Sequence, residues 1–278
     1  MVSRRRAVLS VLGAAAVGAY PFWLEPRWLD VTRRRVRLAR SNRGKPIRVL
    51  HLSDLHASVF VSLRMIGEAI SRGLAAKPDV ICLTGDYVSR PGDTPSPKEY
   101  SQVLRRLSAA APTFAVLGNH DGGSWAAGRM GWANHRLVDR ILEDGGIEIL
   151  HNRSQVVEVR GEKVALAGVG DYWSDEVDAE RAFRGVDSGI PTILLAHNPD
   201  TKELCSAHSW DVMLSGHTHG GQIVVPFYGT PFRAVEDTRY LAGLKYWGTR
   251  QVHVTRGVGN LLGVRLNCRP EVSLLELG

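Results

Sequence analysis

The chain has 278 residues, with 35 lysines and arginines against 28 aspartates and glutamates, a formal net charge of +7. Its hydrophobic content of 44% and charged content of 23% exclude a disordered or fibrous protein. The length suits one large α/β domain or two small ones. Three widely spaced cysteines exclude a disulfide framework.

The positive charge is concentrated at the start of the chain. Residues 1–45 contain eleven basic and two acidic residues, a net charge of +9, so the remaining residues sum to −2. A uniformly basic chain would suggest a nucleic-acid partner. Because the excess charge lies only in the N-terminal region, this distribution argues against a nucleic-acid partner. We expect the basic N-terminal region to direct the protein to a membrane instead.

Residues 1–24 are predicted to form a signal or membrane-anchor segment. Three arginines precede residues 7–24, which carry no charge, and this order is typical of a secretory signal or an N-terminal anchor. The adjacent Arg5 and Arg6 resemble a twin-arginine export signal, which predicts export to the periplasm or cell envelope.

The residues after the apolar run favour a different location. Seven arginines lie between residues 27 and 43, and the positive-inside rule would keep such a flank in the cytoplasm. Attachment to the cytoplasmic face of the inner leaflet is therefore the alternative to export. An ordinary buried helix is a third interpretation of residues 7–24, and cleavage of the segment stays open.

After this segment we expect a basic linker with an exposed edge strand at residues 25–46, and a folded domain at residues 47–278. Helical periodicity predicts helices at residues 63–76, 98–110 and 136–143. Apolar, β-rich runs predict strands at residues 31–38, 47–52, 80–83, 114–117, 147–150, 155–159, 163–169, 192–196, 211–214, 223–225, 251–254 and 272–277. Strands that alternate with helices, followed by a strand-rich tail, predict a layered α/β sandwich with strands at its centre.

Polar side chains follow five of these predicted strands directly. The residues are Asp54 and His56, then Asp86, then Asn119, His120 and Asp121, then His197, and finally His217 and His219. Ligands in open α/β sheets collect at the carboxyl ends of strands, because the loops there converge on one crevice. We therefore expect these side chains to meet in one site.

The residue types indicate a divalent metal site. Carboxylate, imidazole and amide oxygen are ligands for Mn²⁺, Fe²⁺ and Zn²⁺, and no cysteine accompanies them, which disfavours a structural zinc finger. Asp54 and His56 are two residues apart, so they lie on the same side of an extended segment, and His217 and His219 repeat this spacing.

The ordered blocks D-x-H, G-D, G-N-H-D, H and G-H-x-H resemble the calcineurin-like metallophosphoesterase superfamily. The match spans about residues 47–220, and GHTHGGQI, HNPD at 197–200, TRGVG at 255–259 and RPE at 269–271 resemble its bacterial exported or membrane-attached branch (YkuE/YaeI-like). The resemblance implies an α/β fold in which a four-layer α-β-β-α sandwich has central mixed sheets. It also places a dinuclear metal site at the C-terminal ends of the strands.

Carried over to this chain, the resemblance implies two divalent metal ions, Mn²⁺, Fe²⁺ or Zn²⁺, with Asp86 bridging them. The first ion would be held by Asp54, His56, Asp86 and His219, and the second by Asp86, Asn119, His197 and His217. A metal-activated hydroxide would attack the phosphate ester. His120 would contact the phosphate and either stabilise charge or protonate the leaving oxygen.

Other residues are open to more than one interpretation. Asp121 could orient His120 as part of the catalytic apparatus or serve as a turn residue. Asn119, His120 and Arg256 are candidates for substrate binding, and Arg256 and Arg265 could instead be exposed or ion-paired. Trp125 and Trp132 could form a lid or a packed loop, and Asp171–Trp173 could border the pocket or pack. The remaining histidines are expected to be structural or at the surface: His51, His135, His151, His208 and His253.

The resulting prediction is a metal-dependent phosphohydrolase that acts on phosphodiesters. One alternative is hydrolysis of UDP-2,3-diacylglucosamine in lipid A synthesis, which would require the cytoplasmic location. A second alternative is a non-catalytic scaffold of the same fold, which the intact ligand set disfavours. The physiological substrate, the preference for monoesters or diesters, the metal and the oligomeric state stay open.

Overall fold

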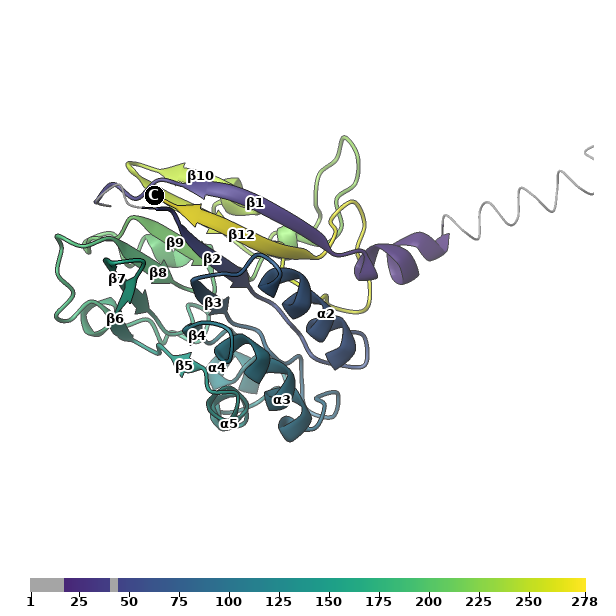
Figure 1. The fold of residues 1–278 in the computed structure, drawn as a ribbon. Helices are drawn as coiled ribbons and strands as arrows, with labels where there is room; N and C mark the ends of the chain where they lie inside the picture. Colours follow the sequence, from purple (N-terminus) through teal and green to yellow (C-terminus); the bar gives the residue numbers. More distant parts are fainter. Residues whose placement is uncertain (1–17, 41–44) are drawn as a thin grey trace, which may run out of the picture.

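The computed structural model describes residues 18–40 and 45–278, which form two six-stranded β-sheets flanked by helices (Figure 1). The first sheet has the order β1-β12-β2-β3-β4-β5. Its strands are β1 (Asp30–Val36), β12 (Glu271–Leu277), β2 (Ile47–Leu52), β3 (Val80–Thr84), β4 (Thr113–Val116) and β5 (Glu148–Ile149). The second sheet has the order β10-β11-β9-β8-β7-β6. Its strands are β10 (Gly243–Trp247), β11 (Arg250–Val254), β9 (Val212–Ser215), β8 (Thr192–Leu195), β7 (Glu162–Gly168) and β6 (Arg153–Val159).

Both sheets are mixed, with parallel strands at their centres. β2, β3 and β4 run parallel in the first sheet, and β7, β8, β9 and β11 run parallel in the second. Strands β12, β6 and β10 are antiparallel to their neighbours β2, β7 and β11. The carboxyl ends of the central strands within each sheet therefore lie at one edge, where the predicted site residues follow them.

The two sheets pack face to face around an apolar core. Val49, Cys82 and Val116 of the first sheet belong to the same buried cluster as Leu166 and Leu214 of the second. These strands are apolar along their whole length because the outer face of each sheet is covered as well. The expected sandwich with central mixed sheets is confirmed.

Helices form the outer layer on the first sheet, and shorter elements cover the second. α2 (Leu63–Leu74), α3 (Pro97–Ser108) and α5 (Arg136–Asp144) cover the first sheet (Figure 1). The second sheet is covered by the short α6 (Ala179–Ala182) and by loops and single helical turns. A further short helix, α4 (Gly123–Ala127), follows the G-N-H-D block.

Helix α2 shows how the sequence determines one of these elements. The Ser62 side chain accepts a hydrogen bond from the Met65 amide at 3.3 Å, which satisfies an N-terminal donor of the helix. Ile66, Ala69 and Ile70 recur at helical spacing and are fully buried against the sheet. The helix ends ahead of Pro78, which cannot continue it, and Lys77 has already left the helical conformation with a φ of 51°.

The predicted strand at residues 223–225 is wrong. Ile223 and Val225 form only isolated bridges, with Leu266 and Gly229, because this segment crosses the molecule as a loop without a continuous neighbour. Strand β10 was not predicted, since its five residues are at most half-buried and show no continuous apolar run. Helices α4 and α6 were also missed, because one turn of helix carries too little periodicity.

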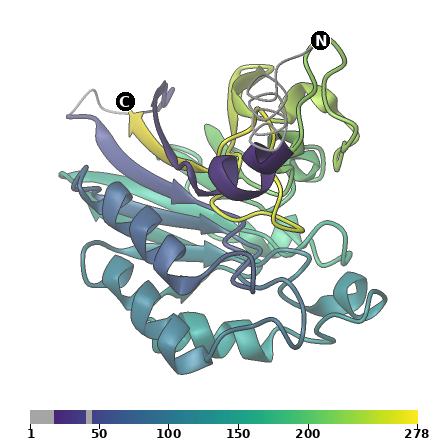
Figure 2. The ribbon, with the colours of Figure 1, turned by 90° about the vertical axis from the view of Figure 1, so that its right-hand side faces the viewer.

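The basic region before residue 47 joins the first sheet. β1 pairs in parallel with β12 at the sheet edge, as the alternating arginines predicted. Helical turns at Tyr20–Leu24 and Glu25–Arg27 lie against the C-terminal loop that precedes β12 (Figure 2). There the buried Glu25 carboxylate accepts hydrogen bonds from the amides of Asn267 and Cys268.

Residues 1–17, the greater part of the predicted signal or anchor segment, lie outside the described residues. In the described ranges, 18–40 and 45–278, no helix combines the length and apolar character needed to cross a membrane.

Candidate metal centre

The structure brings all seven predicted metal ligands to one place between the two sheets. Three strands of the first sheet and two of the second deliver them, because each ligand follows the carboxyl end of a central strand. Every one of them is buried: Asp54, His56, Asp86, Asn119, His197, His217 and His219.

Most of these ligands adopt a backbone conformation that is rare for residues other than glycine. The φ angles of Asp54, Asp86 and His217 are 51°, 57° and 69°, and those of His56 and His219 are 43° and 50°. Left-handed conformations of this kind cost free energy and cluster at functional sites. They turn each side chain from the end of its strand toward the shared centre.

The carboxylate of Asp54 and the rings of His56 and His219 form one group. The Nε2 atoms of the two histidines lie 3.1 Å apart, and His219 Nε2 lies 3.4 Å from Asp54 Oδ1. His56 Nε2 is also 3.4 Å from Asp86 Oδ2. These are the four residues expected to hold the first metal.

The second group is built around Asp86 and His197. His197 Nε2 lies 3.2 Å from Asp86 Oδ2, from Asn119 Oδ1 and from His217 Nδ1. Asp86 therefore faces both groups, as a bridging carboxylate must. The ligand assignment itself stays a prediction, and the contacts agree with the expected division.

The outer nitrogens of the histidines fix which nitrogen faces the centre. His197 Nδ1 lies 2.6 Å from the carbonyl oxygen of Thr84, and His217 Nε2 lies 3.0 Å from that of Ala234. A carbonyl oxygen can only accept a hydrogen bond, so each of these nitrogens carries a proton and the opposite ring nitrogen faces the centre. This is the arrangement of a metal-ligating histidine.

The electrostatics of the site also fit cations. Burial lowers the pKa of His217 to about 3, and it lowers the pKa of His219 well below the ordinary value, so both rings are neutral at pH 7. Burial by itself would lower the pKa of His197, but the Asp86 carboxylate raises it to about 10. The buried carboxylates of Asp54 and Asp86 are shielded from water, so positive charge must lie beside them to balance their charge. The donor set of carboxylates, imidazoles and an amide oxygen suits divalent metals.

Close approach of the backbone requires glycine at two positions. A Cβ on Gly118 would overlap the Asp86 carboxylate, and a Cβ on Gly216 would overlap that of Asp54. The G-N-H and G-H-x-H blocks thus begin with glycine because a ligand occupies the space of the missing side chain.

His120 lies beside the centre and contacts it through its backbone and ring. Its amide donates to Asp86 Oδ1 at 2.9 Å, and its Nδ1 lies 3.0 Å from the carbonyl oxygen of Ser89. Its ring lies edge-on to that of His56, with centroids 5.0 Å apart. Burial lowers the pKa of His120, although the Asp86 carboxylate opposes this.

Asp121 holds the backbone of the site together. Its buried carboxylate accepts hydrogen bonds from the amides of Asp86, Tyr87 and Gly118 at 2.7–2.8 Å. None of these contacts joins Asp121 to the His120 ring, so they do not match the expectation that Asp121 orients His120. The ring is held instead by the Ser89 carbonyl oxygen, which lies beside its Nδ1. Asp121 instead joins the loop after β3 to the loop after β4.

The two candidate phosphate-binding arginines have other partners. Arg256 pairs with Asp30 at 2.8 Å and with Glu271 at 2.9 Å, so its guanidinium links β1 to β12. These contacts do not match the expected substrate-binding role. Arg265 is fully buried and donates to the carbonyl oxygens of Gly259, Arg256 and Cys268. Its Nη2 lies 3.3 Å from His219 Nδ1, so Arg265 supports the loops around that ligand.

Two tryptophans that the sequence left open form an aromatic wall along the site. Trp125 meets the His120 ring at a centroid distance of 5.0 Å and stacks on Trp173 at 5.3 Å. Trp173 in turn contacts His217 edge-on at 4.1 Å. The wall therefore runs from one side of the site to the other. The position of Trp173 in the loop after β7 was the available signal, since β7 ends at the same sheet edge.

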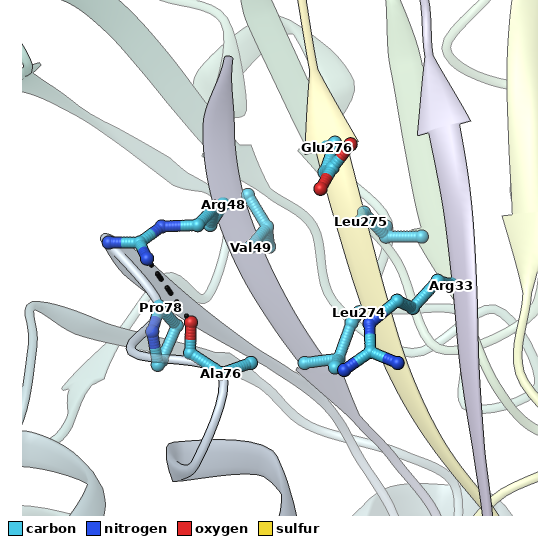
Figure 3. A pocket seen from close by; sticks show the side chains of 8 residues that line it. All are labelled: Arg33, Arg48, Val49, Ala76, Pro78, Leu274, Leu275 and Glu276. Carbon is cyan, nitrogen blue, oxygen red and sulfur yellow. Dashed lines mark hydrogen bonds between the residues drawn. The ribbon is translucent and has the colours of Figure 1, made fainter. Parts of the chain in front are cut away.

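A separate cavity of about 140 Å³ lies near the start of β2, away from the strand ends that carry the site (Figure 3). Arg33, Arg48, Ala76 and Glu276 are among its lining residues, and Arg48 donates to the Ala76 carbonyl oxygen at 3.3 Å. None of the predicted site residues lines it.

Comparison with known proteins agrees with this geometry. The model of the calcineurin-like phosphoesterase family matches residues 47–221. The chain is 41% identical over 280 residues to phosphodiesterase YaeI of Escherichia coli K12, with all of both chains covered. It is 28% identical to the metallophosphoesterase YkuE of Bacillus subtilis, covering 99% of this chain and 98% of that protein.

A more distant relative is the UDP-2,3-diacylglucosamine pyrophosphatase LpxG of Chlamydia trachomatis, 27% identical over 91% of this chain and 90% of that protein. The family model covers more than half of the chain and includes every predicted metal ligand. The chain is therefore a member of the calcineurin-like metallophosphoesterase family.

Proposed function

We propose that this protein is a phosphodiesterase that depends on two divalent metal ions. The observation that carries the proposal is the convergence of seven buried ligand side chains on two groups that share Asp86. The 41% identity to a protein named phosphodiesterase over the whole chain supports the choice of diesters.

The donor set assigns roles to the chain's own residues. Asp54, His56, Asp86 and His219 would hold one ion, and Asp86, Asn119, His197 and His217 the other. When bound, such ions neutralise charge on the phosphate and lower the pKa of the attacking water. The carbonyl oxygens of Thr84 and Ala234 keep His197 and His217 in the required tautomer, and the Ser89 carbonyl oxygen orients His120 beside the phosphate position.

We infer that the substrate carries an apolar group next to the scissile phosphate. A groove of about 290 Å³ is lined by His120, Phe60, Leu261 and Leu262, together with Arg90 and Asp93, which pair at 2.9 Å. The exposed apolar area of these side chains would be covered by such a group. The pair of Arg90 and Asp93 would face a polar part of the same substrate.

A second candidate substrate is UDP-2,3-diacylglucosamine, the compound named for the Chlamydia relative. The same apolar groove supports it, since a diacyl lipid would fill a surface of this kind. This candidate requires the catalytic domain on the cytoplasmic side of the membrane.

For location, we propose attachment to a membrane through the N-terminal segment, with export and the cytoplasmic face as the two alternatives. Phe22 and Trp23, at the end of the apolar run, and Trp28, just after it, are 52%, 71% and 50% exposed. Aromatic side chains in this position favour the interface between a membrane and water. A reporter fused after Gly278 and assayed on each side of the membrane separates the alternatives.

The proposed activity is tested with purified protein, an aryl phosphodiester and Mn²⁺. We expect about two equivalents of metal per chain. We also expect Asp86→Asn to lower activity more than about a hundredfold, because the shared ligand is weakened. Asp144→Asn is the matched control, because Asp144 is an exposed carboxylate at the end of α5. This variant should change neither the metal content nor the activity. Full activity of the Asp86 variant, or a wild-type protein that hydrolyses the ester without metal, would refute the proposal.

A further inference from the structure

A second cluster of metal-ligand side chains lies outside the dinuclear site. One ring nitrogen each from His135 and His151 and one carboxylate oxygen from Glu176 lie within 4.8 Å of one another. His135 precedes α5, His151 lies between β5 and β6, and Glu176 follows β7. Three segments that are distant in sequence thus converge, although the sequence predicted only a structural or surface role for both histidines.

The atoms that meet in this cluster lack hydrogen-bond partners. Nε2 of His135, Nδ1 of His151 and Oε2 of Glu176 are almost inaccessible, and none of them makes a hydrogen bond within the described residues. His135 Nε2 is 3.5 Å from Glu176 Oε2, which is too long for a hydrogen bond. Buried polar atoms without a partner point to an ion or a water molecule at that position.

The charge state of the cluster favours a cation over an ion pair. Burial lowers the pKa of His135, and burial together with the neighbouring His135 ring lowers that of His151. Burial and the nearby Asp171 raise the pKa of Glu176 to about 7. Both imidazoles are therefore neutral at pH 7 and have lone pairs for a metal, which would also draw the proton from Glu176.

The surrounding backbone holds the ligands in place. The Asn152 side chain donates to the Glu176 carbonyl oxygen at 2.7 Å and accepts from the amides of Gly170 and Asp178. Asn152 directly follows His151, so this one side chain ties the two ligand segments together. The Glu176 amide also donates to the Asp171 carbonyl oxygen at 2.9 Å.

We propose that His135, His151 and Glu176 form a third metal site, specific for a divalent ion of the zinc type. Two imidazoles and one carboxylate are a common zinc ligand set, with water in the fourth position. Zinc ligand atoms stand about 3.3 Å apart at the usual bond lengths. The His135–Glu176 pair, at 3.5 Å, is already near this distance, and the other pairs, within 4.8 Å, would close by at most about 1.5 Å.

The site would hold the aromatic wall of the dinuclear centre in position. A Cβ on Gly122 would lie 2.8 Å from the His135 ring, and a Cβ on Gly123 would lie 2.7 Å from Glu176 Oε1. The cluster is thus in contact with the loop that leads from His120 into α4 and Trp125, and Glu176 shares its loop with Trp173. A metal here would fasten these two loops to each other.

The test measures zinc content in two pairs of full-length proteins. Each protein is stripped with a chelator, equilibrated with excess Zn²⁺, separated from free metal and measured by mass spectrometry of the metal. The first pair compares wild type with Glu176→Gln, and the second compares Asp86→Asn with Asp86→Asn/His151→Gln. His208→Gln is the control, since His208 lies next to Glu180 outside the cluster.

We expect each cluster variant to bind one zinc fewer than its parent, and His208→Gln to bind as many as wild type. The comparison in the Asp86→Asn background keeps this result independent of the proposed phosphodiesterase activity. Equal zinc content within both pairs would overturn the proposal, as would the loss of one zinc in His208→Gln. If His151→Gln does not fold, Glu176→Gln in the Asp86→Asn background makes the same comparison.

Discussion

The Nε2 atoms of His56 and His219 lie 3.1 Å apart, although 163 residues separate them in the sequence. One follows β2 of the first sheet and the other follows β9 of the second. The metal centre therefore exists only where the two sheets face each other, and its integrity depends on contacts that hold these loops from behind.

His120→Gln separates two roles for this histidine. If His120 protonates the leaving oxygen, the variant should lose about 10²–10⁴-fold in kcat for an alkyl diester, and much less for an activated aryl diester. If His120 only stabilises charge on the phosphate, both substrates should be slowed equally. The ratio of kcat for the two esters is the measurement, and unchanged kcat for both would exclude either role.

Gly118→Ala adds one methyl group and leaves every ligand side chain in place, and it should still disrupt the metal centre. The added Cβ would overlap the Asp86 carboxylate, so this shared ligand must shift. We expect metal content to fall below one equivalent and activity to fall with it. Gly128→Ala is the control, because its Cβ would meet its nearest neighbours at 3.5 Å, an ordinary contact. Normal metal content in Gly118→Ala would contradict the close contact between Gly118 and the Asp86 carboxylate.

Arg265→Lys should weaken the loops behind His219. A lysine cannot replace the hydrogen bonds that the buried guanidinium makes to Gly259, Arg256 and Cys268. We expect a loss of about 2–4 kcal/mol in the free energy of unfolding and about tenfold weaker metal binding. Urea unfolding and metal titration measure the two effects, with the exposed Arg105→Lys as control. Unaltered stability would show that these contacts contribute little.

Glu271 makes stability depend on pH. Burial by itself would raise its pKa, but the charge of Arg256 and the hydrogen bond from Thr32 lower it. A carboxylate with a lowered pKa stabilises the folded state above its unfolded pKa of about 4.3, and this contribution is lost as the pH falls through the folded value.

Glu271→Gln should therefore cost about 2 kcal/mol in the free energy of unfolding at pH 7, and the difference from wild type should vanish at low pH. Urea unfolding at a series of pH values measures this. The control is Glu276→Gln on the same strand, where the half-exposed carboxylate meets Arg35 at 3.6 Å. A difference that persists below the folded pKa would contradict an ionic origin.

Much of the fold was readable from the sequence because local patterns agree with it. The helices α2, α3 and α5 and the central strands were predicted within a few residues, since each has an unbroken apolar face or run. The segment at 223–225 and strand β10 were not predicted correctly. Pairing of such short, half-exposed segments depends on neighbours that are distant in sequence.

The sequence by itself determined the chemistry of the metal centre, because the ligand types and their order after successive strands restrict what can bind there. Only the tertiary structure decided how the other polar residues act. Asp121 directly follows His120, and Arg256 lies in the TRGVG block, yet their charges meet backbone amides and partner carboxylates instead. His135, His151 and Glu176 have no shared spacing, and only the packing of three loops places them together. Spacing along a chain constrains local geometry alone, whereas burial and charge pairing arise when distant segments pack.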